Sequence, residues 1–322
     1  MSNLDFSEVV YVKVSGHYDG QRLDNFLIRI LKNVPKSRIY NLIRKGEIRI
    51  NKGRCKADSR LAMDDIIRIP PIRSIINNEN PVVTDSLKKY ISENILFEDK
   101  DLLVFNKPSG LAVHGGSGIS MGVIEAFRSL RKSDEYLELA HRIDKDTSGC
   151  LIIAKSRLAL SKIGESLQSN QVKKTYIALV KGNWPKGKSK VNAPLKKNTL
   201  LSGARIVKVD KLGKRSVTNF EITEKYENTT LLKINLETGR THQIRVHCQF
   251  SGMPIVGDEK YGDTVFNSTM KNFGVKRMFL HASKLKFKHP NQSFLIDVMS
   301  PLPDDLKIII DKLNANELPK QN

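Results

Sequence analysis

Apolar residues recur at helical spacing in two short stretches near the start of the chain. The first stretch predicts a helix through Leu23, Phe26, Leu27, Ile30 and Leu31. The second contains Ile39, Leu42 and Ile43. Ser37 is a candidate N-cap for this second helix, and Gly46 a candidate residue just after its end. Residues 47–53 and 65–69 alternate like strands, so a small α/β unit with its core in residues 20–70 is predicted.

A polar segment separates this unit from the rest of the chain. Residues 73–92 contain Asn77, Asn78, Asn80 and Pro81, and nothing in them alternates strongly enough to join a core. We therefore expect a first domain of residues 1–72, a linker of residues 73–92, a second domain of residues 93–315 and a tail of residues 316–322.

The pattern after the linker predicts a larger domain. Strands are expected at residues 102–105, 150–154, 175–180, 219–222 and 230–236. Helical spacing occurs near residues 121–131, 157–168 and 241–250. Because the strands outnumber helices that could connect parallel neighbours, an α+β fold with a mixed, largely antiparallel sheet is favoured over a doubly wound one.

Charge is the strongest compositional signal. The 322 residues include 54 Lys and Arg against 34 Asp and Glu, a formal net charge of +20. Such an excess predicts a polyanionic partner, and it runs through segments that should fold. Nucleic acid is favoured over a membrane, since aromatic residues make up only 7% of the chain. Within residues 20–70 basic side chains far outnumber acidic ones, which indicates a phosphate-binding surface.

The compartment follows from what the sequence lacks. No apolar run approaches the roughly 18 residues of a membrane span, and the N-terminus has no signal-peptide pattern. Cys55, Cys150 and Cys248 are widely separated and suggest neither a disulfide framework nor a zinc knuckle. We therefore expect a cytoplasmic protein with reduced thiols.

Residues 141–149, with the sequence HRIDKDTSG, are the most informative segment for chemistry. They form a run of charged and hydrogen-bonding side chains that leads into the predicted buried strand at residues 150–154, a common way to hold a catalytic group on a rigid sheet. Asp144 is the obvious candidate. The alternative is that the short polar residues of this segment only satisfy turn and cap hydrogen bonds, namely Asp144, Asp146, Thr147 and Ser148.

A second run, TGRTHQIRVH at residues 238–247, ends a predicted strand and starts a predicted helix. Gly239 would make the turn, and Thr241 could cap the helix. The run also carries Arg240 and Arg245. An arginine buried beside Asp144 would keep that carboxylate ionised and aim it.

Other kinds of site fit the sequence less well. A metal could in principle be shared by His141, His242, His247 and His281. None of them stands in HxxxH or HExxH spacing, so they are interpreted as structural. Asp144 and Asp146 are a weak magnesium signal. Residues 182–189 match a phosphate-loop pattern, but Pro194 would stop the helix that this motif needs.

Three segments of the first domain carry a resemblance. Residues 22–27 (RLDNFL), 35–38 (PKSR) and 43–51 (IRKGEIRIN) resemble the small RNA-binding domain named after ribosomal small-subunit protein S4. That family grips structured RNA with its second helix and the following turn. The resemblance implies contacts with RNA phosphates from Lys36, Arg38, Arg44, Lys45 and Lys52.

Five motifs in order along the larger domain resemble the RluA-type pseudouridine synthases. They are residues 106–116 (NKPSGLAVHGG), 141–149, 174–176 (KTY), 239–247 and 279–282 (FLHA). The one departure is Ile143, where the family usually has Leu, a swap of similar volume. The resemblance implies isomerisation of uridine to pseudouridine in large-subunit ribosomal RNA, with no metal or organic cofactor. We expect the protein to act as a monomer.

The same resemblance assigns roles to individual residues. Asp144 matches the essential aspartate, and Arg245 the arginine that pairs with it. Asp144 could attack the sugar, add to the uracil ring or abstract a ribose proton, and the sequence leaves all three routes open.

The remaining matched residues would form the pocket. Arg142 would occupy the gap left in the RNA when the target uridine swings out, and Tyr176 would stack on the uracil. Leu280 would be an apolar wall, and His141 and Thr147 would bind the substrate.

Two other classes of protein account for part of the pattern. A non-catalytic RNA-binding or ribosome-assembly factor would explain the charge but not the loop that carries Asp144. A metal-dependent nuclease is the third possibility.

Overall fold

The computed structural model describes residues 6–31, 34–72, 83–115, 121–131, 135–199 and 205–315 of the chain. Contacts divide the chain into two compact units. The first comprises residues 1–83 and 131–136, and the second residues 84–130 and 137–322. Within the described ranges, no helix is both long enough and apolar enough to cross a membrane.

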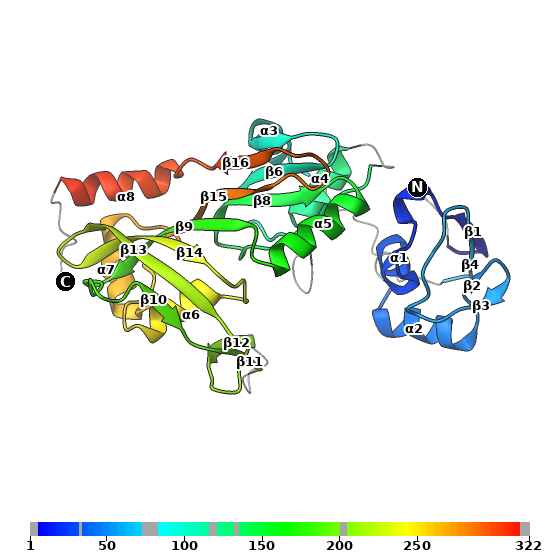
Figure 1. Ribbon diagram of the computed structural model, residues 1–322, viewed down its shortest axis with the longest axis horizontal. Coiled ribbons are helices and arrows are strands. Elements are labelled where there is room, and N and C mark those ends of the chain that lie inside the picture. The colour runs from blue at the N-terminus through cyan, green and yellow to red at the C-terminus, as the bar shows by residue number, and fades with distance from the viewer. Residues whose placement is uncertain are drawn as a thin grey trace. The chain divides into compact units, whose positions relative to one another are not determined.

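The first unit packs two α-helices beside a small sheet (Figure 1). Its elements are β1 (Val10–Lys13), η1 (Gly16–Tyr18), α1 (Leu23–Ile30), α2 (Lys36–Lys45), β2 (Arg49–Ile50), β3 (Gly53–Arg54) and β4 (Ile66–Ile69). The strand order is β1-β4-β2-β3, with every pairing antiparallel. Leu23, Phe26 and Ile39, which predicted the helices, are fully buried in the core. The predicted α/β unit is therefore confirmed.

Two details of the first unit differ from expectation. Ser37 is not the N-cap of α2, because Pro35 holds that position in an extended conformation and Lys36 begins the helix. Proline suits this place, since it donates no backbone hydrogen bond and disfavours helix before it. The core, expected within residues 20–70, also begins before residue 20, because Val12 and Val14 belong to it. Gly46, with φ of 71°, ends α2 as predicted.

The second unit is larger and mixes strands with helices. In chain order it contains α3 (Asp85–Glu93), β5 (Ile95–Glu98), β6 (Leu102–Lys107), α4 (Val123–Leu130), β7 (Glu138–Leu139), β8 (Ser148–Ala154), α5 (Arg157–Gln168), β9 (Lys173–Lys181), β10 (Lys190–Asn192), β11 (Leu195–Thr199), β12 (Arg205–Val209), β13 (Val217–Lys225), β14 (Thr229–Leu236), α6 (Gln243–Phe250), α7 (Thr264–Phe273), β15 (Leu280–Lys288), β16 (Leu295–Met299) and α8 (Asp304–Asn314). A strand, β10, follows the phosphate-loop-like pattern instead of a helix.

One large sheet organises this unit. Its strand order is β10-β13-β14-β9-β15-β8-β6-β5, with β16 beside β15 and β7 beside β8. The pairing of β8 with β15 is parallel, whereas the other pairings described in the sheet are antiparallel. The predicted α+β fold with a mixed, largely antiparallel sheet is confirmed. Figure 1 shows α3, α4 and α5 near the β6–β8 part of the sheet and α6 and α7 near the β13–β14 part.

The parallel contact between β8 and β15 depends on one glycine. Gly149 follows the Asp144 loop with φ of 108°. A Cβ atom at this position would lie 2.2 Å from the carbonyl oxygen of Ala282. Only glycine combines this conformation with so close a backbone approach, which lets β8 enter the centre of the sheet directly after the loop.

The predicted linker is wrong in its second half. Helix α3 starts after Thr84, whose side-chain oxygen accepts a hydrogen bond from the backbone N–H of Leu87 at 3.3 Å. Ile91 of this helix is only 3% exposed, so residues 85–92 belong to the second unit. A single buried residue over nine leaves too weak a period to recognise. Residues 73–82 and the predicted tail 316–322 lie outside the described residues.

Candidate active site

The Asp144 side chain stands in the loop between β7 and β8. The backbone turns here, because the N–H of Thr147 donates to the carbonyl oxygen of Asp144 at 3.2 Å. Turn formation therefore uses the main chain of Asp144 and leaves its carboxylate, whose side chain is 17% exposed, available for another task. Thr147, predicted to bind substrate, is buried, with 2% of its surface exposed.

Lys107 of the 106–116 motif holds the backbone of the Asp144 loop in place. Lys107 is fully buried, and its Nζ donates to the carbonyl oxygens of Pro108, Leu111 and Lys145, each at 2.8 Å. Burial lowers the pKa of Lys107 to about 7, against the opposing charges of Asp146 and Asp144. Three carbonyls match the three N–H donors of an ammonium group, so this lysine rigidifies the backbone next to Asp144.

Helix α6 brings Arg245 to the catalytic candidate. Its Nη1 donates to Oδ2 of Asp144 at 3.0 Å. Its Nε and Nη2 donate to the two carboxylate oxygens of Asp258 at 2.7 and 2.8 Å. The guanidinium of Arg245 thus links the partly exposed carboxylate of Asp144 to the fully buried carboxylate of Asp258. The bidentate pair with Asp258 fixes the orientation of the guanidinium.

Sequence reasoning missed Asp258, which holds this arginine in place. It lies after α6 in a loop, and its Oδ1 also accepts the backbone N–H groups of Lys260 and Tyr261. Burial would raise the pKa of Asp258, but the hydrogen bonds and charge of Arg245 outweigh it, so the pKa is lowered. Burial likewise opposes the charge of Arg245, yet Asp258 and Asp144 raise the pKa of Arg245 above its ordinary value. Both groups are therefore ionised at neutral pH.

The neighbouring strands β9 and β15 supply two predicted pocket residues. Tyr176 of β9 is 7% exposed, and burial, assisted by the charge of Asp144, raises the pKa of its phenol above the ordinary value. Leu280, at the start of β15, is 3% exposed and lies opposite Ala178 of β9. The phenol therefore stays neutral at physiological pH.

Arg142 and His141 begin the Asp144 loop but differ in environment. Arg142 is exposed, and among the described residues none accepts a hydrogen bond from its guanidinium. The Nε2 atom of His141 instead accepts the backbone N–H of Ile152 at 3.0 Å. Burial lowers the pKa of His141 to about 3, so the imidazole is neutral. The substrate-binding role expected for His141 stays a prediction.

The other histidines of the sequence patterns do not converge. His247 bonds the hydroxyl of Thr218 and the carbonyl oxygen of Ala193. His281 likewise bonds Ser148 and the carbonyl oxygen of Ser300. Both rings use both nitrogens for structure, as interpreted from the sequence.

The N-cap prediction for α6 is wrong. His242, not Thr241, precedes the helix, with φ of 54° and no side-chain cap hydrogen bond. Its imidazole is turned to Tyr261 instead: Nδ1 lies 2.8 Å from the phenol oxygen.

One group of possible metal ligands occurs within the described residues, at Asp99, Asp101 and His289. The backbone N–H of Asn291 donates to Nδ1 of His289 at 3.1 Å, so the ring proton resides on Nε2. That proton points at Oδ2 of Asp99, 2.7 Å away. Since a metal would need the lone pair of Nε2, we assign the cluster to structure: it fastens the β16 hairpin to the turn before β6.

The first unit presents the predicted RNA-contacting residues on its surface. Lys36, Arg38, Arg44 and Lys45 lie on α2 and Lys52 lies in the β2–β3 turn, and all five are exposed. A groove of about 870 Å³ lies at α2, and Arg44 is the one of these five residues that lines it. It is lined by Ser37, Tyr40, Asn41, Ile43, Arg44, Arg54, Cys55, Lys56, Ala57 and Ser59. Three cationic residues, Arg44, Arg54 and Lys56, line this groove, which makes it suited to a phosphate backbone.

Comparison with known proteins identifies both units. The sequence model described as RNA pseudouridylate synthase matches residues 101–250, and the S4 domain model matches residues 21–67. The chain belongs to the RNA pseudouridylate synthase family, and its first unit contains an S4 domain. The protein is therefore an RNA pseudouridine synthase, an isomerase, as its motifs predicted.

Curated relatives match almost from end to end. Ribosomal large subunit pseudouridine synthase C of Haemophilus ducreyi is 50% identical over 97% of this chain and 98% of its own. The protein of the same name from Escherichia coli (strain K12) is 47% identical over 95% of this chain and 97% of its own. A solved structure titled human RNA Pseudouridylate Synthase Domain Containing 4 is 26% identical, with a TM-score of 0.59, and covers 71% of this chain and 96% of its own.

Proposed function

We propose that this protein converts uridines of large-subunit ribosomal RNA to pseudouridine, with Asp144 as the catalytic carboxylate. The observation that carries the assignment is the buried link from Asp144 through Arg245 to Asp258. It holds one charged oxygen in a fixed direction at the end of a central strand, as a catalytic group requires. The names of the curated relatives support the large ribosomal subunit as the source of the RNA.

The reaction is an isomerisation and balances without a co-reactant. The bond between N1 of uracil and C1′ of ribose breaks, the base turns, and its C5 bonds to C1′. C5 then loses a proton and N1 gains one, so the composition of the nucleotide is unchanged. Asp144 acts in this sequence on the sugar, on the uracil or on a ribose proton.

The hydrogen bonds of Asp144 support different tasks for its two carboxylate oxygens. Oδ2 accepts from Arg245 at 3.0 Å. Within the described residues, Oδ1 accepts no hydrogen bond, and the Nε2 atom of His242 lies 4.0 Å from it. Oδ2 therefore anchors the carboxylate while Oδ1 faces the substrate.

The pocket residues would hold the uridine after it leaves the RNA. Tyr176 and Leu280, on neighbouring strands, would contact its base, and the exposed Arg142 would fill the gap that it leaves. An aromatic face offsets lost stacking by about 1–3 kcal/mol per base. His141 and Thr147 would support this pocket from the loop.

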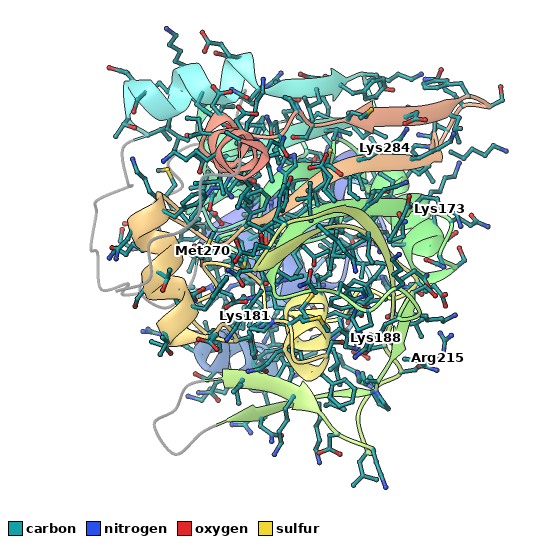
Figure 2. All side chains as sticks on the ribbon, turned by 90° about the vertical axis from the view of Figure 1, so that its left-hand side faces the viewer. Lys173, Lys181, Lys188, Arg215, Met270 and Lys284 are labelled. Atoms are coloured by element: carbon teal, nitrogen blue, oxygen red, sulfur yellow. The ribbon has the colours of Figure 1, made fainter. Side chains whose placement is uncertain are left out.

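The S4 domain would supply affinity through its exposed cations. Basic side chains also lie on the second unit: Figure 2 shows Lys173, Lys188, Arg215 and Lys284 towards the right-hand side of the view. Together they would let the protein follow a folded RNA. We place the reaction in the cytoplasm, by a monomer that uses neither metal nor organic cofactor.

The test is to incubate the protein with unmodified large-subunit RNA in EDTA. Pseudouridine is then mapped by carbodiimide treatment and primer extension. Product formed without metal supports the proposal. Cleavage that EDTA abolishes would identify a nuclease instead, and unchanged RNA would leave only binding.

A further inference from the structure

His242 stands beside the proposed catalytic carboxylate without a role in the reaction described above. Its Nε2 atom lies 4.0 Å from Oδ1 of Asp144, and its side chain is 19% exposed. Its Nδ1 atom lies 2.8 Å from the phenol oxygen of Tyr261. The imidazole therefore bridges a fully buried tyrosine and the oxygen of Asp144 that faces the substrate.

The hydrogen bonds determine which nitrogen of His242 carries the proton. The phenol oxygen of Tyr261 accepts the backbone N–H of Val207 at 3.0 Å, and Tyr261 is only 1% exposed. Burial raises the pKa of Tyr261, so the phenol keeps its proton. Among the described residues, Nδ1 of His242 is the acceptor within reach of that proton. The neutral imidazole consequently carries its own proton on Nε2, directed to the side of Asp144.

Charge on the ring is disfavoured. Burial lowers the pKa of His242, an effect that Arg245 and Lys260 reinforce and Asp144 and Asp258 oppose. The neutral ring offers one donor, and its place is set by Tyr261, whose ring also lies 5.0 Å from the guanidinium carbon of Arg245.

The backbone of His242 shows that this position is kept at an energetic cost. Its φ of 54° lies in the left-handed region, which a non-glycine residue adopts only with backbone strain. The side chain recovers none of this by capping α6. Backbone strain of this kind persists where the surrounding contacts hold a side chain in one orientation.

We propose that His242 contacts the substrate: its Nε2–H donates a hydrogen bond to an oxygen of the target uridine that lies against Asp144. A separation of 4.0 Å is too long for a direct bond to Oδ1. A uridine oxygen seated beside the carboxylate could instead accept this proton. Tyr261 is then a positioning residue, because it fixes the tautomer that donates. This inference rests on the proposed function of Asp144.

The experiment compares His242→Asn with His242→Gln in the full-length protein. Asparagine tolerates the left-handed backbone but is too short to reach the position of Nε2, whereas glutamine can place an amide N–H there. Single-turnover rates are measured at saturating RNA, together with the dissociation constant and thermal unfolding. We expect a rate about 10²-fold lower for His242→Asn, partial recovery for His242→Gln, and unchanged affinity and unfolding temperature.

Tyr261→Phe tests the link to the tautomer. Removing the hydroxyl should slow the single-turnover rate, and the His242→Asn/Tyr261→Phe pair should be no slower than His242→Asn alone, since both changes remove one donor. Independent, multiplying losses would contradict the role given to Tyr261. A His242→Asn rate within threefold of wild type would overturn the role given to His242. An inactive wild type would instead refute the proposed function.

The uridine oxygen that accepts the hydrogen bond from His242 is either the ribose 2′-hydroxyl or a uracil carbonyl. A change in the substrate distinguishes the two. RNA with 2′-deoxyuridine at the target is compared with uridine in both wild type and His242→Asn. If the 2′-hydroxyl accepts the bond, its removal should cost the variant less than it costs the wild type. Equal losses in both proteins would identify the uracil carbonyl.

Discussion

The two units hold their functional cations in opposite ways. On the S4 domain Lys36, Arg44 and Lys52 are exposed. Each attracts phosphate only weakly because salt screens the charge, and the affinity comes from the number of such contacts. In the catalytic unit Arg245 is buried, and each of its three nitrogens bonds a carboxylate oxygen. The exposed cations can contact RNA phosphates, whereas the buried arginine bonds only Asp258 and Asp144 among the described carboxylates. The comparison separates binding from chemistry, and the variants below test that separation.

The largest effect is expected from Arg245→Met. The change leaves Asp258 buried without its partner, so the free energy of unfolding should fall by about 3–5 kcal/mol and activity should be lost. The chain has one tryptophan, and Trp184 is 1% exposed within the catalytic unit. Its fluorescence during urea unfolding therefore reports on this unit. Arg240→Met, at an exposed arginine near the start of the same helix, is the control and should change little. Equal stability of the two variants would contradict the buried link.

Replacing the five S4 cations with glutamine should have the next largest effect. Binding should weaken roughly tenfold or more, and the slope of log affinity against log salt should fall by about one unit per phosphate contact removed. The turnover rate at saturating RNA should survive, since none of these residues belongs to the site. Salt titrations of binding measure both quantities.

The control for that variant is Lys88→Gln with Lys89→Gln. Both lysines lie on α3, where Lys88 pairs with Asp85 and Lys89 with Glu93. The two substitutions therefore remove positive charge from a helix with no proposed RNA contact. An S4 variant whose salt slope matched this control would show that the S4 surface has another partner.

A smaller effect is expected from His141→Gln on acid stability. The pKa of His141 is lowered from 6.5 to about 3, so between these two pH values the unfolded chain binds this proton and the folded chain does not. Stability is therefore fully present above pH 6.5 and is lost as pH falls towards 3, by at most about 1.4 kcal/mol per pH unit. Trp184 fluorescence in urea at several pH values should show a flatter slope in the variant. His114→Gln, at an exposed histidine of the same unit, is the control, and an unchanged slope in His141→Gln would contradict the neutral ring.

The fold was predictable where one period covered a whole element. The helix predicted at residues 157–168 matches α5, Arg157–Gln168. Strand β15 escaped prediction because its first four residues are buried on both faces and only its second half alternates. Helix α3 escaped because Ile91 is its one fully buried residue. Tertiary packing, not local pattern, decides such segments.

The site was predictable where its residues stand in ordered motifs. The sequence named Asp144 and Arg245, which the fold brings within 3.0 Å across 101 residues of chain. Asp258 and Tyr261 were not predicted, because they lie in a loop, where the sequence has no repeating pattern of apolar residues that would indicate burial. Their importance depends on the hydrogen bonds to Arg245 and His242, which appear only after folding.

The most direct test of the account is the single-turnover rate of Asp144→Asn on large-subunit RNA, measured beside its affinity. Asp146→Asn is the matched control, because it removes an exposed carboxylate from the same loop. The account predicts no detectable pseudouridine from Asp144→Asn, affinity close to wild type, and normal turnover by Asp146→Asn. A rate for Asp144→Asn within tenfold of wild type would contradict the assignment of Asp144 as the catalytic carboxylate.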